Sequence, residues 1–456
     1  MNEYRNAVIA FAAACPVIAQ AQTTQELKAE LGALKAHVQK LEAMIEKAEQ
    51  PKPDNGAELA RLRVKSDALD DAMETSGLKG LKISGYIDPS YIRNRNAGTS
   101  SFVFLNNNSS VNGSGESFGY DNTTFGSGMF NLDKELEGGT RLRISLMPSK
   151  GIASGYNFGN LVHEASASIP LGDQSTRLLL GQIPDWSGYE YIPSTQNKLL
   201  THNLLFDFSA ANFYTGAGLQ LVRGKWDSKV MIGNMNRARV DDGGERTPGV
   251  FYRVDYARGE FSGFGMSGTH AGFDDDSAVG RVDLMEVDGF YTRGDWNIQG
   301  QLSYGGQQAT AANLYGAARQ RWYGLSSLVS YKIMPRLEAI ARLDYIFNGT
   351  GGGGVFGATL APGCKDLAGF AANCPDGRNG FGSGMVLRGG QWFVIDPTRG
   401  ANRGTLSVGT QYLLVPGVSV KGEYRYDYAT ARVFKTFDGQ YRRDNHVIGV
   451  STVVSF

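Results

Sequence analysis

The sequence predicts an all-β transmembrane barrel of about 16 antiparallel strands in an up-and-down meander, preceded by an α-helical coiled-coil segment. Three observations predict this class. Apolar and polar residues alternate with a period of two from Leu81 to Phe456. Short and long connections alternate between the strands, and the chain ends on an aromatic residue that closes an alternating segment.

The composition of the 456-residue chain fits a barrel, with 60 glycines and 11% aromatic residues. Its mean hydropathy of -0.27 is low, and no run of about 18 apolar residues follows the N-terminus, so we expect no transmembrane helix in the mature protein. A barrel keeps a low mean hydropathy because lipid-facing and lumen-facing residues alternate. The 45 basic residues equal the 45 acidic ones, which argues against nucleic acid as a partner.

Residues 1–21 are predicted to be a signal peptide. Arg5 provides a weak positive region, residues 7–19 form an apolar stretch, and Ala19-Gln20-Ala21 is a small-x-small cleavage site. We expect cleavage after Ala21 and export of the mature chain.

Residues 22–50 are predicted to form a coiled-coil helix. Its heptad seam consists of Leu27, Leu31, Leu34, Val38, Leu41 and Ile45. Prolines in the linker 51–57 stop this helix, and a second short helix is expected over 58–76. These helices either pack on each other or on the barrel, or form a parallel oligomeric coiled coil; the strict spacing favours the oligomer without deciding between dimer and trimer.

Three segments show the alternation most clearly, namely 296–304, 337–347 and 418–428. In the last of them, tyrosines occupy one face while Lys421 and Glu423 begin a charged face. Each segment therefore has one apolar and one polar face, which both a membrane barrel and a soluble sandwich would require.

The connections distinguish the two architectures. Candidate strands begin near Leu81, Phe125, Thr140, Val162, Thr176, Phe213, Trp226, Thr247, Glu260, Arg281, Asp295, Arg319, Pro335, Gly404, Val418 and Arg443. Every second connection is short, as at 223–225 and 416–417, and the longest spans about 349–403. This pattern is typical of short periplasmic turns and long outer loops, whereas a Greek-key sandwich has no reason to keep it. An even strand number places both ends of the barrel, and the N-terminal arm, on the periplasmic side.

The last strand alternates up to its final residue. Ile448, Val450, Thr452, Val454 and Phe456 form one face of this strand. It resembles the C-terminal strand of outer-membrane proteins. This resemblance implies that the strand, with its final aromatic residue, is a signal for the barrel-assembly machinery. Location in the outer membrane, in contact with its lipid, is therefore expected.

Short motifs carry a family resemblance. The run Ile83-Ser84-Gly85-Tyr86-Ile87-Asp88, and residues 179–184 leading to 188–190, are similar to segments of proteobacterial OmpL-like porins and, more distantly, of phosphate-selective porins. The resemblance covers the arm and the barrel in layout and implies a homotrimeric, passive diffusion channel for small hydrophilic solutes or ions. The alternative is a structural barrel whose coiled-coil arm tethers the outer membrane to the periplasm or cell wall. A barrel of about 16 strands leaves an aqueous lumen, which favours the channel.

The resemblance also implies that the third outer loop, residues 184–212, folds into the lumen. The candidates to touch solute at this constriction are Asp185, Glu190, Lys198 and His202. The alternative is that the loop merely packs against the wall through its apolar residues, which are Leu199, Leu200, Leu204, Leu205, Phe206 and Phe208.

Alternation predicts the charged residues of the lumen wall. The basic ones are Arg141, Arg143, Arg253, Arg342, Lys421 and Arg425, and the acidic ones are Asp255, Glu338, Asp344, Glu423 and Asp427. Rings of one sign make a pore ion-selective, and this mixture predicts no clear anion selectivity. Pairing across neighbouring strands is the favoured role for most of these charges.

Cys364 and Cys374 lie in a Gly-rich loop, and in an exported chain they predict a disulfide. The alternative, a metal pair, lacks nearby histidines. None of the five histidines stands in a nucleophile-elbow or metal-ligand spacing. We therefore expect no enzyme activity, cofactor or metal.

Overall fold

A computed structural model describes residues 77–104, 125–147, 161–236, 247–272, 279–309, 319–350, 380–396 and 399–456, with eleven single positions between 32 and 68. The chain divides into two compact units, Met1–Gly77 and Leu78–Phe456. The eleven described positions between 32 and 68 are helical, and the extents of the two helices stay predictions. The predicted signal peptide, the heptad seam and the cysteines Cys364 and Cys374 lie outside the described residues.

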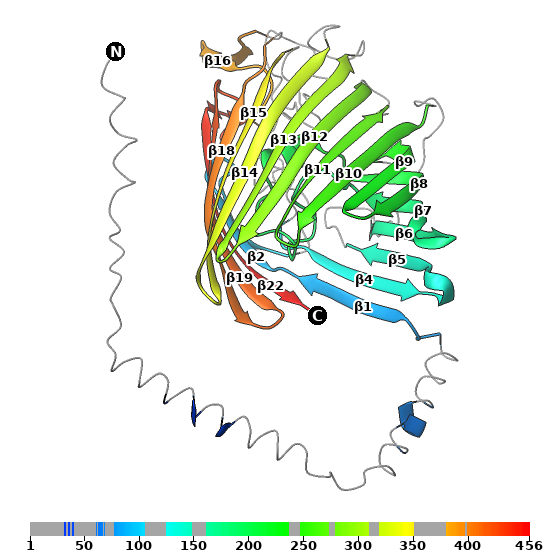
Figure 1. Cartoon of the computed structure of the whole chain (residues 1–456). Helices are drawn as coiled ribbons and strands as arrows, with labels where there is room; N and C mark the ends of the chain where they lie inside the picture. The colour runs from blue at the N-terminus through cyan, green and yellow to red at the C-terminus, as the bar shows by residue number, and fades with distance from the viewer. Residues whose placement is uncertain are drawn as a thin grey trace. The chain divides into compact units, whose positions relative to one another are not determined.

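The second unit is a closed antiparallel barrel of 16 strands (Figure 1). The first strand consists of β1 (Leu81–Ile87) and β2 (Ser90–Asn94), and the second consists of β3 (Thr99–Val103) and β4 (Gly128–Glu135). The other strands are β5 (Arg141–Leu146), β6 (Val162–Leu171), β7 (Asp173–Pro184), β8 (Phe213–Arg223), β9 (Trp226–Met235), β10 (Gly249–Gly259), β11 (Ser262–Ala271), β12 (Val279–Arg293), β13 (Trp296–Ala309), β14 (Gln320–Met334), β15 (Leu337–Thr350), β18 (Arg403–Val415), β19 (Val418–Ala429) and β22 (Asp444–Ser455). Each pairs with its neighbours in the chain, and β22 closes the ring against β1 and β2. The predicted strand number is confirmed.

Two short hairpins, one 3-10 helix and one α-helix lie in the connections. The hairpins β16 (Met385–Arg388) with β17 (Gln391–Val394), and β20 (Phe434–Lys435) with β21 (Tyr441–Arg442), are separate from the barrel sheet. The 3-10 helix η1 (Glu137–Gly139) forms a short turn, and the helix α4 (Leu204–Ser209) lies between β7 and β8. The Asn203 side chain caps α4 by accepting a hydrogen bond from the Phe206 amide at 2.8 Å.

The barrel begins and ends on the side of its short turns. Gly417, in the turn between β18 and β19, has a φ of 80° that favours glycine. The Ser455 amide donates to the Gly417 carbonyl at 2.8 Å, and Leu81 pairs with Lys134 just before another short turn. Both ends of the barrel therefore lie beside short turns. That this side faces the periplasm remains a prediction.

The wall is apolar outside and polar inside. On β13, Leu302 is 61% exposed while its neighbour Gln301 is 3% exposed, and on β15, Leu343 is 54% exposed while Arg342 is 1% exposed. A soluble protein would bury the leucines and expose the arginine, whereas lipid around a polar lumen requires this inverted pattern. The faces predicted for 296–304 and 337–347 are therefore confirmed. Among the described residues, no helix is long and apolar enough to cross a membrane.

Candidate functional site

Residues 185–212, which connect β7 to β8, lie inside the barrel and are called the inner loop here. The Tyr189 hydroxyl hydrogen-bonds the Ser326 hydroxyl of β14 at 2.6 Å, and the Lys198 ammonium donates to Glu338 of β15 at 2.7 Å. The Ser194 amide lies 3.4 Å from the Tyr86 hydroxyl of β1. Because one segment contacts strands so far apart around a closed ring, it must pass through the interior of that ring.

Arg342 of β15 is the main anchor of the inner loop. Its guanidinium donates to the Glu190 carboxylate at 3.0 Å, to the Thr201 carbonyl at 2.6 Å and to the His202 carbonyl at 2.8 Å. The Nε donates to Asp344 on the same strand at 3.2 Å. The planar fork of an arginine can bind several acceptors at once, so a single wall residue joins both halves of the loop.

Two charged residues of β19 hold the tip of the loop. The Glu423 carboxylate accepts hydrogen bonds from the Leu200 and Thr201 amides, both at 2.8 Å, and from the Thr201 hydroxyl at 2.6 Å. The Lys421 ammonium donates to the carbonyls of Ser194 and Asn197. Charge-assisted hydrogen bonds are about twice as strong as neutral ones, so these wall charges position loop backbone.

His202 stabilises the loop from within. Its Nε2 donates to the Tyr191 carbonyl at 3.0 Å, and its Nδ1 lies 3.5 Å from the Asp207 carboxylate. Burial lowers the pKa of His202, but the hydrogen bond and charge of Asp207, with the charge of Glu190, raise it above the ordinary value. Through these contacts His202 ties the start of the loop to α4.

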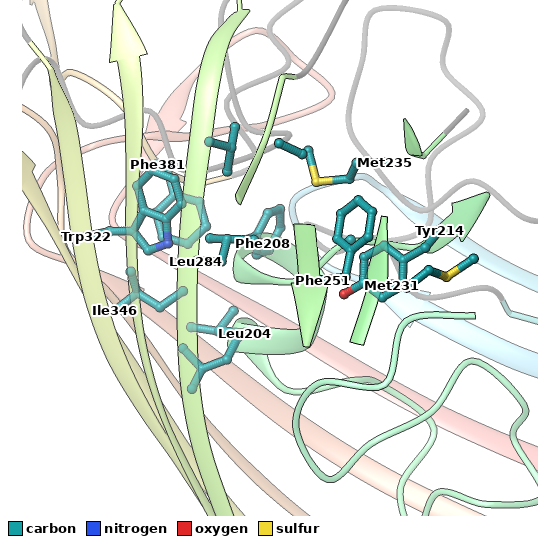
Figure 2. Close-up of a cluster of buried hydrophobic side chains, with 14 residues drawn as sticks. Leu204, Phe208, Tyr214, Met231, Met235, Phe251, Leu284, Trp322, Ile346 and Phe381 are labelled. Carbon is teal, nitrogen blue, oxygen red and sulfur yellow. The ribbon is translucent and has the colours of Figure 1, made fainter. Parts of the chain in front are cut away.

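Apolar side chains of α4 fill one part of the lumen. Leu204, Leu205 and Phe208 are fully buried in a cluster with residues of β8 to β15. Figure 2 shows Leu204 and Phe208 between Trp322 and Ile346 on one side and Phe251, Tyr214 and Met231 on the other. The Trp322 Nε1 donates to the Ser209 hydroxyl at 2.9 Å. The loop thus packs against the wall, as the apolar alternative expected.

A cavity of about 660 Å³ lies between the inner loop and the facing wall. The loop contributes Asp185, Trp186, Tyr191, Pro193 and Gln196 to its lining. The wall contributes the charged side chains of β5, β6, β9, β10 and β12, which are Arg143, Glu164, Asp227, Lys229, Arg253, Asp255 and Asp288. The wall side carries most of the charged side chains of the cavity, and the loop side mixes aromatic, polar and acidic side chains.

The predicted constriction residues have different places. Asp185 borders the cavity and accepts hydrogen bonds from Ser187 and the Tyr214 hydroxyl. Among the described residues, those that line the cavity do not include Glu190, Lys198 or His202, which make the loop contacts given above. Their contact with solute stays a prediction.

The predicted wall charges also fall into two groups, those that line the cavity and those that hold the inner loop. Arg143, Arg253 and Asp255 line the cavity, whereas Glu338, Arg342, Lys421 and Glu423 hold the inner loop. Asp344 accepts from Ser326 and Thr405, Arg425 pairs with Asp427 at 3.0 Å, and Arg141 lies 3.5 Å from Glu135. Pairing is the main role of these charges, but the partners include the loop as well as neighbouring strands.

The sequence-based prediction missed four charged residues of the cavity lining, Glu164, Asp227, Lys229 and Asp288. Asp288 of β12 follows the exposed Val287, so strand alternation could have identified it. The two residues of β9 alternate with the exposed Val230 and Ile232, and this signal could have identified them. Glu164 was not recoverable, because the register of β6 against β5 shifts beside it and breaks the alternation. Within the part of the chain that the structure describes, no group of three or more His, Cys, Asp or Glu side chains could hold a metal ion.

A sequence model of the family described as "Protein of unknown function (DUF3138)" matches residues 2–246 and 260–456. No curated protein matches the sequence.

The structure is similar to Salmonella typhi OmpF in complex with daunomycin, with 10% identity and a TM-score of 0.51 over 82% of this chain and 97% of that chain. It is similar to an anion-selective porin from Comamonas acidovorans, with 10% identity and a TM-score of 0.50 over 82% and 99%. It is also similar to a loop-deletion mutant of OmpT, an outer membrane protein of Vibrio cholerae, with 9% identity and a TM-score of 0.50 over 82% and 99%. At this identity the similarity establishes the barrel fold alone.

Proposed function

The chain belongs to the DUF3138 family of proteins of unknown function, and from the geometry of its barrel we propose that it is a porin, a passive diffusion channel for small hydrophilic solutes or ions. The observation that carries the proposal is the cavity of about 660 Å³ between the inner loop and a charged wall. Barrels of about 16 strands are wide enough to leave an aqueous channel. A loop held across such a lumen narrows it to the size of a small solute.

The inner loop is proposed as the constriction of this channel. Asp185, Trp186 and Tyr191 border the cavity from the loop side, while Arg342 and Glu423 hold the loop from behind. This division favours a rigid constriction, because the residues that set its position are buried and paired. Glu190, Lys198 and His202 then act on solute passage through the shape of the loop, in addition to any contact of their own.

The proposal includes location and assembly. Export after signal cleavage at Ala21, insertion by the barrel-assembly machinery, a periplasmic arm and C-terminus, and a homotrimer related to OmpL-like porins form one consistent picture. The apolar outer face of the barrel supports a lipid environment.

Purified, refolded protein is expected to produce stepwise conductance in a planar lipid bilayer, because ions enter the hydrated cavity beside the loop. The measurement is single-channel current in KCl. The same preparation after boiling, which unfolds the barrel, is the control. Folded protein that inserts without conductance steps would contradict the porin proposal.

One observation favours the alternative of a plugged, structural barrel. The cluster around Leu204, Phe208 and Trp322 fills part of the lumen with tightly packed side chains, and a barrel closed in this way would serve as an anchor for the coiled-coil arm. The bilayer measurement separates the two functions, since a plugged barrel inserts and folds but stays electrically silent.

Deleting residues 22–76 is expected to lower the yield of oligomer while leaving the barrel folded. The arm carries the proposed oligomeric seam, whereas the barrel is closed by β22 against β1 without it. Light scattering and migration before and after boiling measure the two properties. In the full chain, Leu34→Lys changes the seam and Ala36→Lys, at an exposed helical position, is its matched control. Loss of the heat-modifiable band in the deletion would overturn this prediction.

A further inference from the structure

The charges around the cavity do not balance. Among the described residues, five carboxylates line it, and these are Glu164, Asp185, Asp227, Asp255 and Asp288. Three permanent cations face them, namely Arg143, Lys229 and Arg253, together with His163. The whole chain is neutral, so this acidic surplus is a local property of the cavity.

The Arg253 guanidinium is saturated by acceptors. Its terminal nitrogens donate to both oxygens of Asp288 at 2.8 and 2.9 Å, and its Nε donates to Asp255 at 2.9 Å. One terminal nitrogen also donates to the Trp186 carbonyl at 2.8 Å. All three nitrogens are engaged, so the guanidinium is poorly placed to bind an anionic solute. One positive charge shared by two carboxylates leaves a net negative group, in which Asp255 is the most exposed member.

The remaining cations are also matched or outnumbered. The Arg143 Nε lies 3.2 Å from Asp133 and 3.8 Å from Glu164, so it too stands between two carboxylates. The Lys229 ammonium lies 3.6 Å from Asp227. Neither cation reverses the local surplus.

Among the described residues that line the cavity, the inner loop contributes no positive charge. Lys198 pairs with Glu338 at 2.7 Å and Arg342 is fully buried among its acceptors. Asp185 faces the cavity, and burial raises the pKa of its carboxyl. Even without Asp185, the described wall residues of the cavity set four carboxylates against three permanent cations.

We propose that the pore prefers cations, and that the Arg253–Asp255–Asp288 group is the principal determinant of this selectivity. Negative side chains concentrate cations in a narrow aqueous path and repel anions. This inference rests on the proposed channel function and names its solute class as small cations or cationic organic molecules.

The test is the reversal potential of the reconstituted full-length protein across a KCl gradient. Wild type is expected to show a permeability ratio of K⁺ to Cl⁻ above one. Asp255→Asn, which keeps the size of the side chain and removes its charge, is expected to lower the ratio by roughly tenfold. One unit charge about 6 Å away in water changes the local concentrations of K⁺ and Cl⁻ by about threefold each, in opposite directions. Asp227→Asn, in a different ion pair, is a second variant with the same expected direction.

The matched control is Asp438→Asn, because Asp438 is an exposed carboxylate in the β20–β21 hairpin outside the cavity lining. A ratio unchanged in Asp438→Asn and lowered in Asp255→Asn supports the proposal. Clear conductance steps with a preference for chloride overturn the cation selectivity and leave the channel function standing. If Asp255→Asn and Asp438→Asn change the permeability ratio equally, the role of the Arg253 group is overturned. If no conductance steps occur at all, the channel function is overturned together with its selectivity.

Discussion

Replacement of Arg342 with methionine is expected to release the inner loop and to raise single-channel conductance, with large fluctuations of the open current. The substitution removes the donors to Glu190, Thr201 and His202. It also leaves Glu190, Asp344 and Glu423 as buried carboxylates around an apolar side chain. Removing one partner of a buried ion pair costs about 3–5 kcal/mol, enough to dislodge a loop held by a few such contacts.

Arg342→Lys and Arg336→Met are the controls for this prediction. Lysine keeps the charge but cannot bind several acceptors in one plane, so an intermediate increase in conductance is expected. Arg336 is exposed in the turn before β15, and its replacement is expected to leave conductance unchanged. Wild-type conductance and noise in folded Arg342→Met would show that the loop does not depend on this anchor.

Phe208→Ala is expected to lower the free energy of unfolding by about 3–5 kcal/mol, the usual cost of removing a buried phenyl ring, and therefore to lower the melting temperature. Phe208 is completely buried and packs edge-on against Phe381 at a centroid distance of 4.9 Å. Its ring also lies 5.4 Å from the Arg403 guanidinium, which contacts the rings of Phe381 and Phe434 as well. Loss of the ring therefore weakens the packing of α4 and of Phe381 beside it.

The measurement is gel electrophoresis of samples heated to increasing temperatures, and the melting temperature is the one at which the fast-migrating folded band disappears. Phe437→Ala is the matched control, because Phe437 is 75% exposed and contributes little to packing. Equal melting temperatures for Phe208→Ala and wild type would contradict the view that α4 is part of a packed core inside the barrel.

The barrel was predictable because two solvents impose a pattern on each strand. Lipid selects Leu302 and Leu343 for the outer face, and the polar interior with its inner loop selects Gln301 and Arg342 for the inner face. Turn lengths then ordered the strands into a meander. The irregular features were not predictable, as with the second strand, which is split into β3 and β4 and pairs with both β2 and β1.

The loop that forms the candidate site was predictable from the sequence, but the residues of that loop that line the cavity were not. The family resemblance implied that residues 184–212, between the fifth and sixth strands, fold into the lumen, and the leucines of this segment indicated packing against the wall. The choice of cavity-lining residues was less accurate, because Glu190 and His202 lie in the contacts that hold the loop. A charge in a loop looks the same in the sequence whether it faces solute or a buried partner.

Local periodicity and turn length in the chain specify the strand number, the faces of the strands and the position of both barrel ends beside short turns. Which charges remain around the cavity depends instead on the three-dimensional arrangement. Arg342 and Arg253 both stand on inward faces, yet one anchors the loop and the other lies in the cavity wall with Asp255 and Asp288. That difference depends on which strands and loop residues the closed ring brings together, because the sign of the field in a lumen is set by neighbours distant in sequence.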